Sequence, residues 1–426
     1  MNSTTLNRIE PASTPKPHFL DGLAARAVHR RLAGLTHGQV TLVDGTSHRR
    51  FGQRTAHCPL SVTLQVHDPR FYSDLAFGGS IGAGEAWMQG YWSVNDLTAL
   101  VRILLQNRAV LDGMETGLAR LTAPLQKALH WLNRNTRAGS RRNIAAHYDL
   151  GNDFFALFLD PTMMYSSAIF AQPYMTLEAA QLARLDHICR KLDLTPRDHL
   201  LEIGTGWGGM AIHAAQHYGC RVTTTTISQE QYKLASARVH TAGLENRISV
   251  LLKDYRDLDG QYDKLVSIEM IEAVGHDFYD TYFGKCAALL KDDGLMLLQA
   301  ITIADQRYEA ARNSVDFIQR YIFPGSCIPS ITAMNDSITR ASDLKLAHLE
   351  DIGPHYATTL RLWRENFLRN AEAVRALGYP ESFLRMWEFY LCYCEGGFEE
   401  RALGDVHMLL AKPGNRRAPI VPELSA

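Results

Sequence analysis

Apolar segments alternate with amphipathic ones between residues 199 and 302, and this alternation constrains the fold more than any other feature of the chain. Strands are predicted at residues 199–203, 221–227, 248–252, 263–268 and 295–302. Helices are predicted between them at residues 207–218, 229–242 and 278–290. Strands separated by helices of this length form parallel sheets with right-handed crossovers. The sequence therefore predicts an α/β fold with a doubly wound sheet.

A glycine-rich turn joins the first predicted strand to the first predicted helix. Gly204, Gly206 and Gly209 satisfy the G-x-G-x-x-G pattern, which is also typical of dinucleotide-binding folds. A nicotinamide site would carry an acidic residue about 20 positions further on, at the end of the second strand. Residues 223–228 read Thr-Thr-Thr-Thr-Ile-Ser instead, which weakens the nicotinamide interpretation.

Two acidic residues favour S-adenosylmethionine as the ligand. Glu202 ends the first strand directly before the glycines, and Asp254 follows the third strand. The glycines would let the backbone approach the amino acid and ribose, and Asp254 could accept a hydrogen bond from the adenine amino group. The structural alternatives are that Glu202 caps a strand end and Asp254 caps a loop. Ser228 and Gln231 could form a helix capping box, which is compatible with a ligand contact.

The N-terminal part of the chain has a different pattern. An amphipathic helix is predicted within residues 20–35, strands at residues 39–44 and 61–67, and a turn at Asp44-Gly45. A stretch rich in glycine and aromatic residues follows at positions 78–92. These features predict a small, mixed α/β domain. The basic residues Arg134, Arg137, Arg141 and Arg142 then mark a linker, which is either a solvated surface or a contact with anionic phospholipid headgroups.

Composition excludes several classes of function. The 44 Lys and Arg residues are balanced by 45 Asp and Glu residues, so the net charge of -1 gives no positive field for a nucleic acid. No run approaches the roughly 18 apolar residues of a membrane span, and we expect a cytoplasmic protein. Seven cysteines without a C-x-x-C pair predict reduced thiols. No metal site is predicted, because His213 and His217 lack the glutamate of a zincin motif.

Several long motifs resemble, in order along the chain, those of the cyclopropane-fatty-acyl-phospholipid synthases and the mycolic acid cyclopropane synthases. The resemblance covers residues 68 to 412, and its motifs lie at residues 146–155, 159–161, 165–168, 201–209, 226–231, 254–258, 279–283 and 321–325. It implies a Rossmann-like class I methyltransferase with S-adenosylmethionine as cofactor and S-adenosylhomocysteine as product. Together with the glycine turn, it indicates a cofactor site made of Tyr165, Ser166, Glu202, Gly204, Gly206, Trp207, Gly208, Thr226, Ile227, Gln231, Asp254, Tyr255 and Arg256.

The resemblance also implies a catalytic bicarbonate ion beside the transferred methyl group. The positions that hold this ion correspond to Ser167, Glu272, Gln299, Tyr356 and the backbone of Ile301. A cysteine near the C-terminus has been treated as catalytic in this family, and it corresponds to Cys394. A small buried thiol is an equally good interpretation of that cysteine.

The chemistry of such an enzyme explains these residue types. Methyl transfer to an isolated double bond leaves a carbocation that water would quench, so a dry aromatic pocket is needed. A base must then remove a proton to close the ring. Residues that could present rings to the cation are Tyr165, Phe170, Tyr321, Phe323 and Tyr356, whereas Phe154, Phe155 and Phe158 are interpreted as core.

This chain departs from the family pattern close to the expected base. Ser167 stands where a cysteine is typical, Gln299 where a histidine is typical, and Glu269 where a glycine is typical. Glu269 and Glu272 would repel each other unless one of them is protonated or turned away. The residues around Glu269 and Gln299 resemble a side branch of the family that includes makers of methylene- or methyl-branched fatty acids.

Three functions remain open from the sequence. The first is a methyltransferase that converts unsaturated acyl chains of phospholipids into cyclopropane fatty acids, and the second gives methylene- or methyl-branched chains from the same substrates. The third is a non-catalytic lipid- or cofactor-binding protein. The expected organisation is a disordered tail at residues 1–18, a lipid-associated domain at 19–133, the basic linker at 134–142, the methyltransferase domain at 143–412 and a tail at 413–426. Peripheral membrane binding, a homodimer and no nucleic-acid partner are expected.

Overall fold

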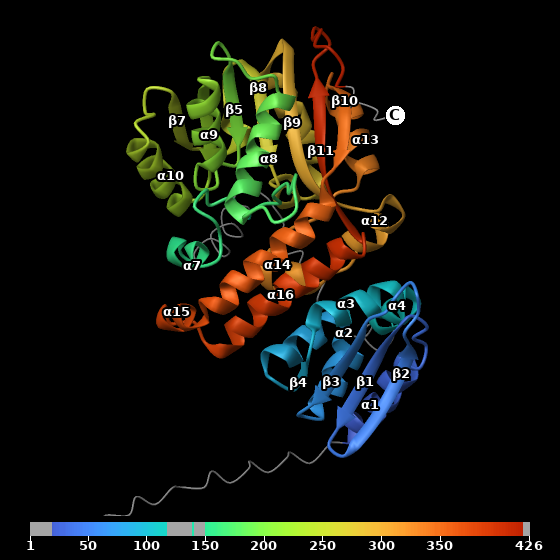
Figure 1. Cartoon of the computed structure of the whole chain (residues 1–426). Helices are drawn as coiled ribbons and strands as arrows, with labels where there is room; N and C mark the ends of the chain where they lie inside the picture. The colour runs from blue at the N-terminus through green and yellow to red at the C-terminus, as the bar shows by residue number, and fades with distance from the viewer. Residues whose placement is uncertain (1–18, 117–138, 140–149, 421–426) are drawn as a thin grey trace, which may run out of the picture. The chain divides into compact units, whose positions relative to one another are not determined.

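The computed structural model describes residues 19–116, 139 and 150–420. These residues belong to two compact units, of which the first contains residues 19–96 and 107–116 and the second contains residues 97–106, 139 and 150–420 (Figure 1). Helix α3 (Leu97–Gln106) therefore belongs to the second unit, although it lies within the predicted N-terminal domain. The predicted tail at 1–18 and the arginines at 134, 137, 141 and 142 lie outside the described residues, so the expectations for them stay predictions.

The first unit is a small mixed α/β fold, as predicted. Its elements are α1 (Phe19–Leu32), β1 (Gly38–Asp44), β2 (Ser47–Gln53), β3 (Ser61–Val66), α2 (Arg70–Met88), β4 (Trp92–Val94) and α4 (Arg108–Thr116). The strand order is β2-β1-β3-β4, with β1 antiparallel to β2 and parallel to β3. The Asp44-Gly45 signal is a hairpin turn, since Asp44 pairs with Ser47. Most of the stretch rich in glycine and aromatic residues lies in α2, which is kinked at Gly79 where φ is 57°, and the stretch ends at the start of β4.

The second unit is built on a seven-stranded sheet of order β10-β11-β9-β8-β5-β6-β7. Its strands are β5 (His199–Ile203), β6 (Arg221–Thr226), β7 (Ile248–Leu252), β8 (Tyr262–Ile268), β9 (Leu290–Ile303), β10 (Lys345–Asp351) and β11 (Leu403–Ala411). Strands β5 to β9 are parallel, and β11 is antiparallel to both β9 and β10. The predicted doubly wound parallel sheet is confirmed, and β10 and β11 extend it beyond the strands that the sequence assigned.

Helices connect these strands and cover both faces of the sheet. The longer ones are α8 (Leu177–Lys191), α9 (Gly209–Tyr218), α10 (Gln229–Thr241), α11 (Tyr279–Leu289), α13 (Ile331–Ala341), α14 (Gly353–Arg369) and α16 (Glu381–Glu399). Shorter ones are α7 (Asn152–Ala156), α12 (Asp305–Arg312), α15 (Ala371–Ala376), η2 (Tyr255–Asp257), η3 (Ile271–Ala273), η4 (His276–Phe278) and η5 (Ile318–Ile322). Helices α14 and α16 lie side by side (Figure 1).

Alternation along the strands builds two hydrophobic layers. On β9, Met296 and Leu298 pack with α11 and α13 on one face, whereas Leu295 and Leu297 pack with α8 and α9 on the other. Further along the α8 face the strands become polar, because Gln299 on β9 lies opposite His407 on β11. The sheet thus has an apolar interior that ends in buried polar groups at the carboxyl end of β9.

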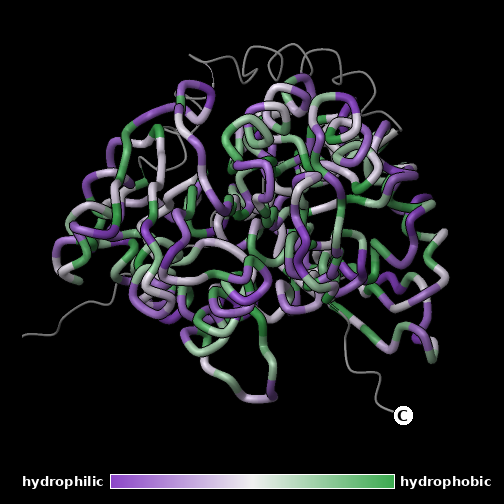
Figure 2. The backbone as a smooth tube through the Cα atoms, turned by 90° about the horizontal axis from the view of Figure 1, so that it is seen from above, coloured by the Kyte–Doolittle hydropathy of each residue, from purple (hydrophilic) through white to green (hydrophobic). Residues whose placement is uncertain are grey.

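Hydrophobic and hydrophilic residues are interspersed along the described backbone (Figure 2). Among the described residues, no helix is both long enough and apolar enough to cross a membrane. The seven cysteines all carry free thiols.

Candidate active site

The glycine turn predicted between the first strand and the first helix has an open, left-handed backbone. Gly204, Gly206 and Gly208 have φ angles of 101°, 50° and 86°. A Cβ atom built on Gly206 would meet nothing within 4 Å, so open space lies over the middle of the turn. A Cβ atom on Gly209 would lie 2.6 Å from Sδ of Met164, which explains why this position must be glycine. The turn therefore fits a ligand that approaches the backbone at Gly206.

Glu202 lies buried beneath this turn. Its Oε2 accepts a hydrogen bond of 2.6 Å from the hydroxyl of Thr224, which lies 2.7 Å from the hydroxyl of Thr205. Burial raises the pKa of Glu202 to about 8. The side chain thus joins β5, β6 and the turn, and this arrangement supports a structural role in shaping the turn.

The residues after β6 and β7 form two local caps. Ser228 accepts a hydrogen bond of 3.3 Å from the backbone of Gln231 and caps helix α10, while the Thr226 hydroxyl donates to Oε1 of Gln231. Asp254 caps η2 and accepts two further hydrogen bonds, of 2.8 and 2.6 Å, from the guanidinium of Arg256. Ser228 and Asp254 are therefore helix caps, but the predicted capping box is incomplete, because the backbone N–H of Ser228 donates to the Thr226 hydroxyl and not to Gln231.

The backbone near these caps remains accessible. Gly204, Gly206, Ile227, Tyr255 and Arg256 keep intermediate exposure, while Thr226, Gln231 and Asp254 are buried. The sheet order places the ends of β5, β6 and β7 side by side, so these predicted cofactor residues share one edge of the sheet. That arrangement and the open space over Gly206 fit S-adenosylmethionine.

Tyr165 and Trp207 belong to an aromatic cluster next to the turn, whereas Ser166 is buried against Gln181 and Arg184 on α8. The Trp207 ring is buried, lies 4.9 Å from the Phe155 ring and donates to Oδ1 of Asn152 at 2.6 Å. The Tyr165 ring lies 5.3 Å from Phe155, and its hydroxyl is 2.9 Å from that of Tyr390. Other members of the cluster are Phe154, Phe158, Phe323, Tyr356, Trp363 and Trp387.

This cluster supplies the aromatic surroundings that the chemistry requires. Phe154, Phe155 and Phe158 are fully buried, which confirms that they are core residues. Tyr165 and Phe323 keep intermediate exposure and can present their rings to a ligand. Tyr321 packs on Phe317, and Phe170 lies near His355.

The loop after β8 brings an acidic side chain to the positions predicted to bind an anion. Oε1 of Glu269 accepts hydrogen bonds of 2.8 Å from the backbone N–H of Ser167 and 2.8 Å from Nε2 of Gln299. Oε2 of Glu269 accepts a hydrogen bond of 2.6 Å from the hydroxyl of Tyr356. Three of the five predicted bicarbonate ligands therefore donate to the carboxylate of Glu269.

The other two predicted ligands meet each other. Oε1 of Glu272 accepts a hydrogen bond of 2.6 Å from the backbone N–H of Ile301, and its Oε2 is buried without a hydrogen-bond partner among the described residues. Burial, followed by the negative charge of Glu269, raises the pKa of Glu272 to about 8. Glu269 and Glu272 thus point to different partners and Glu272 is protonated near neutral pH, in agreement with the predicted response to their repulsion.

A bicarbonate ion does not fit this arrangement. The donors of Ser167, Gln299 and Tyr356 are already bound to a carboxylate of the same charge, and Ile301 is bound to Glu272. An additional anion would have to displace Glu269 against these hydrogen bonds. The expected bicarbonate site is therefore filled by a side chain of the protein itself.

Two buried residues that the sequence did not single out, one acidic and one basic, belong to the surroundings of Glu269. Asp405 on β11 accepts a hydrogen bond of 3.0 Å from Nε2 of Gln299, and burial together with the charge of Glu269 holds its pKa well above the usual range. Arg184 on α8 is fully buried and donates to the Ser166 hydroxyl at 3.0 Å. The signal in the sequence that could have indicated Arg184 is a polar spacing along α8. This spacing puts Gln181, Arg184 and Lys191 on the buried side of the helix.

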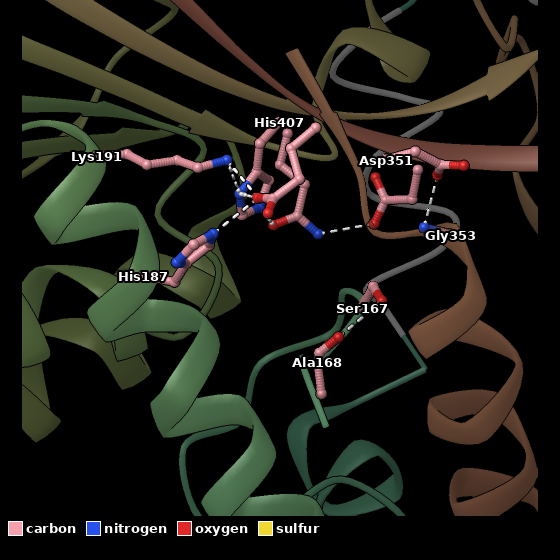
Figure 3. A network of polar contacts seen from close by, with 10 residues as sticks. Ser167, Ala168, His187, Lys191, Asp351, Gly353 and His407 are labelled. Atoms are coloured by element: carbon pink, nitrogen blue, oxygen red, sulfur yellow. Dashed lines mark hydrogen bonds and ion pairs between the residues drawn. The ribbon is translucent and has the colours of Figure 1, made fainter. Parts of the chain in front are cut away.

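A second polar group lies behind Gln299. Nε2 of His407 lies 3.1 Å from Oε1 of Gln299, and Nδ1 of His407 lies 3.4 Å from the ammonium of Lys191. Lys191 and His187, both on α8, also contact the Glu350 carboxylate at 2.5 and 2.7 Å (Figure 3). His187, Glu350 and His407 could geometrically hold a metal ion, but the ammonium of Lys191 occupies the shared oxygen and opposes a cation there.

Cys394 lies on α16 in surroundings that suppress its reactivity. Burial, together with the nearby Asp316, raises the pKa of its thiol. A nucleophilic or basic cysteine needs a lowered pKa and positive surroundings. Cys394 keeps intermediate exposure, and its raised pKa favours the interpretation of an unreactive thiol over a catalytic one.

Comparisons with known proteins agree with this fold and site. The sequence profile of the mycolic acid cyclopropane synthetase family matches residues 135–408. The chain is 38% identical to the tuberculostearic acid methyltransferase of Mycobacterium tuberculosis, over 95% of each protein. It is 37% identical to the cyclopropane-fatty-acyl-phospholipid synthase of Escherichia coli, over 79% of this chain and 85% of that protein.

Solved structures give the same relationship. The mycolic acid cyclopropane synthase solved in complex with SAH and CTAB superposes with a TM-score of 0.60 and 33% identity, covering 64% of this chain and 98% of that one. The fold is that of the class I S-adenosylmethionine-dependent methyltransferases, as predicted. This chain belongs to the mycolic acid cyclopropane synthetase family of S-adenosylmethionine-dependent methyltransferases.

Proposed function

We propose that this protein adds the methyl carbon of S-adenosylmethionine to the double bond of an unsaturated acyl chain carried by a phospholipid. The observation that carries the proposal is the contact between the glycine turn and the acidic loop. A Cβ atom on Gly204 would lie only 3.3 Å from Cγ of Met270, the residue between Glu269 and the η3 turn that holds Glu272. A group bound at the turn would therefore lie next to a carboxylate and beside the Tyr165 aromatic cluster.

The residues at this site match the needs of the reaction. Bound S-adenosylmethionine supplies an electrophilic methyl group, and the double bond that accepts it becomes a carbocation. The rings of Tyr165 and Phe323 can stabilise such a cation by about 2 kcal/mol where water is excluded. A carboxylate beside the turn can then accept the proton whose removal such a reaction requires.

The timing of proton loss decides the product. Direct loss of a proton from the added methyl group closes a cyclopropane ring. A 1,2-hydride shift before that loss gives a methylene branch, and we propose this branched chain as a second candidate product. Two observations favour it. Ser167, Glu269 and Gln299 depart from the pattern of the cyclopropane synthases around the base, and a relative aligned over 95% of both chains is named a tuberculostearic acid methyltransferase.

We further propose that the protein works as a peripheral enzyme at the cytoplasmic membrane surface and as a homodimer. A phospholipid substrate requires access to a bilayer, and the basic residues of the linker, which lie outside the described part of the chain, supply positive charge for that contact. The N-terminal unit is proposed to assist lipid binding.

Mass spectrometry of phospholipids from cells with and without the protein tests this function. Acyl chains heavier by one CH₂ unit are expected only when the protein is present. Fragmentation then locates the added carbon and separates a ring from a branch. Unchanged lipids in cells that contain folded, cofactor-binding protein would contradict the proposal and leave the non-catalytic binding function.

A further inference from the structure

Three acidic residues meet at the carboxyl end of β8 and β9, and a ligand can reach one of them. Glu272 and Asp405 are buried, with 8% and 0% of their surface exposed. Glu269 keeps intermediate exposure although protein surrounds it. A base must touch the carbon that it deprotonates, so accessibility distinguishes Glu269 from its two acidic neighbours.

Glu269 also accepts more hydrogen bonds than Glu272 or Asp405, and such bonds favour the ionised form of a carboxyl group. Burial raises the pKa of Glu269 above its ordinary value, and the hydrogen bonds that its two oxygens accept from the Ser167 amide, the Gln299 amide and the Tyr356 hydroxyl oppose that rise. Burial holds the pKa of Asp405 well above its usual range and raises that of Glu272 to about 8, so burial favours the protonated form of both groups. The fully buried guanidinium of Arg184 adds an attractive positive charge.

The backbone at Glu269 is unusual for a residue with a side chain. Its φ angle is 45°, in the left-handed region that favours glycine. Strained residues of this kind persist where the surrounding contacts fix them, and they cluster at functional sites. Glu269 is fixed by the hydrogen bonds to its carboxylate and by the bond from its backbone N–H to the Gln299 carbonyl oxygen, so the carboxylate stays in one position despite the strain.

We propose that the carboxylate of Glu269 is the general base of the reaction and occupies the position that a free anion would otherwise fill. The inference rests on the proposed function. In this step a C–H bond of the added carbon breaks and its proton moves to an oxygen of Glu269. The released electron pair forms the closing C–C bond of a ring, or the second bond of a methylene group, and thereby neutralises the carbocation.

Two variants of Glu269 and a bicarbonate series test this assignment. Turnover is measured on phospholipid vesicles in buffer freed of dissolved carbonate and again with added bicarbonate. The unmodified enzyme should have the same rate in both buffers. E269Q, in which the amide fills the same space, and E269G, which relieves the left-handed backbone, should each lose roughly 10²- to 10⁴-fold in turnover while retaining S-adenosylhomocysteine binding by calorimetry.

Bicarbonate should then restore activity selectively. E269G leaves the donors of Ser167, Gln299 and Tyr356 free to hold a small anion, so added bicarbonate should raise its turnover at least tenfold. E269Q should show no rescue, because its side chain still fills the site. The matched control is E365Q on the exposed part of α14, where Glu365 pairs only with Arg361 among the described residues, and it should behave as the unmodified enzyme in both buffers.

The outcomes separate this inference from the proposed function. An unmodified enzyme that makes no one-carbon product from any unsaturated phospholipid contradicts the function itself. An active enzyme that slows without bicarbonate, or an E269Q variant with full activity, overturns only the role of Glu269. An E269G variant that binds S-adenosylhomocysteine yet stays inactive at every bicarbonate concentration also overturns it, because the carboxylate would then not occupy an anion position.

Discussion

Gly206 and Gly209 lie three residues apart in one turn but serve different purposes. Open space lies around the Cβ position of Gly206, whereas that of Gly209 is filled by Met164 and by the carbonyl oxygen of Thr162. The first glycine therefore leaves room for a ligand, and the second lets the segment before the aromatic cluster pack against α9. Both requirements are met by glycine, so the sequence alone does not distinguish the ligand-binding glycine from the packing glycine, whereas the structure does.

This difference predicts that an alanine at Gly206 mainly weakens ligand binding, whereas an alanine at Gly209 mainly lowers stability. G206A should fold, with a stability cost of about 1–2 kcal/mol from its φ angle of 50°, and should bind S-adenosylhomocysteine at least tenfold more weakly. G209A should lose more stability, because its Cβ atom would overlap Met164 and Thr162. Calorimetric binding and urea unfolding measure the two effects. Wild-type affinity in G206A would contradict a cofactor at this turn.

Two buried glutamates make the stability of the protein depend on pH. The pKa values of Glu202 and Glu272 are raised to about 8 from the ordinary value of 4.5. The folded state therefore holds protons that the unfolded state has released, and stability is fully present below pH 4.5 and lost as the pH rises through 8. Each group lowers the free energy of unfolding by up to about 1.4 kcal/mol per pH unit in this range.

Urea unfolding at several pH values checks this dependence. The urea concentration at the unfolding midpoint should decrease as the pH is raised from 5 to 9. The decrease should be smaller in E202Q and E272Q, whose substituted side chains remain neutral at every pH. A pH-independent midpoint in the unmodified protein would show that both side chains are ionised when folded.

The role of Glu269 could not be predicted from neighbouring residues. Its partners Gln299, Tyr356 and Ser167 lie 30, 87 and 102 positions away in the chain, and only the fold brings them together. The sequence did predict that Glu269 and Glu272 could not both be charged and facing each other. The caps at Ser228 and Asp254 were predictable, because both depend on contacts two or three residues apart.

At the level of elements, the alternation of strands and helices between residues 199 and 302 predicted the order correctly because both faces of the sheet are apolar. The helix α9 begins at Gly209 and not at Trp207, since Gly208 has a φ angle of 86° that no helix accepts. Strands β10 and β11 were not assigned. On β11, polar Asp405 and His407 alternate with apolar Val406 and Met408 and face α8, so the strand lacks a continuous apolar run.

Strand β11 also orients the amide of Gln299. Since Nε2 of His407 donates to Oε1 of Gln299, the amide nitrogen faces Glu269 and Asp405. H407F should lower turnover up to about tenfold, the worth of one hydrogen bond, without changing S-adenosylhomocysteine affinity. H407Q can still donate to Gln299 and should recover most of that loss, which a purely structural effect of the substitution would not explain.

Two quantities are measured for each His407 variant, the affinity for S-adenosylhomocysteine and the rate of product formation. A parallel loss of both in H407F would indicate damage to the fold and contradict a positioning role. Equal turnover in H407F and the unmodified enzyme would show that Gln299 needs no partner on β11.

At the scale of the whole molecule, the proposed reaction requires a soluble cofactor and a lipid chain to reach one site. Positive and negative residues nearly cancel to a net charge of -1, so attraction to an anionic bilayer must come from a local group of basic residues. Sedimentation with anionic vesicles should therefore weaken as salt rises, and R137E, R141E and R142E combined should weaken it further. Equal binding to neutral vesicles at all salt concentrations would remove the linker from the account.

The most direct measurement follows the hydrogens of the transferred carbon. The enzyme is incubated with unsaturated phospholipid vesicles and S-adenosylmethionine that carries three deuterium atoms on its methyl group, and the acyl chains are analysed by mass spectrometry. Transfer followed by proton loss from the added carbon predicts that each modified chain retains two of the three deuterium atoms. Chains that retain all three would show that the proton leaves from another carbon, and unlabelled chains would show that the methyl group does not reach the lipid.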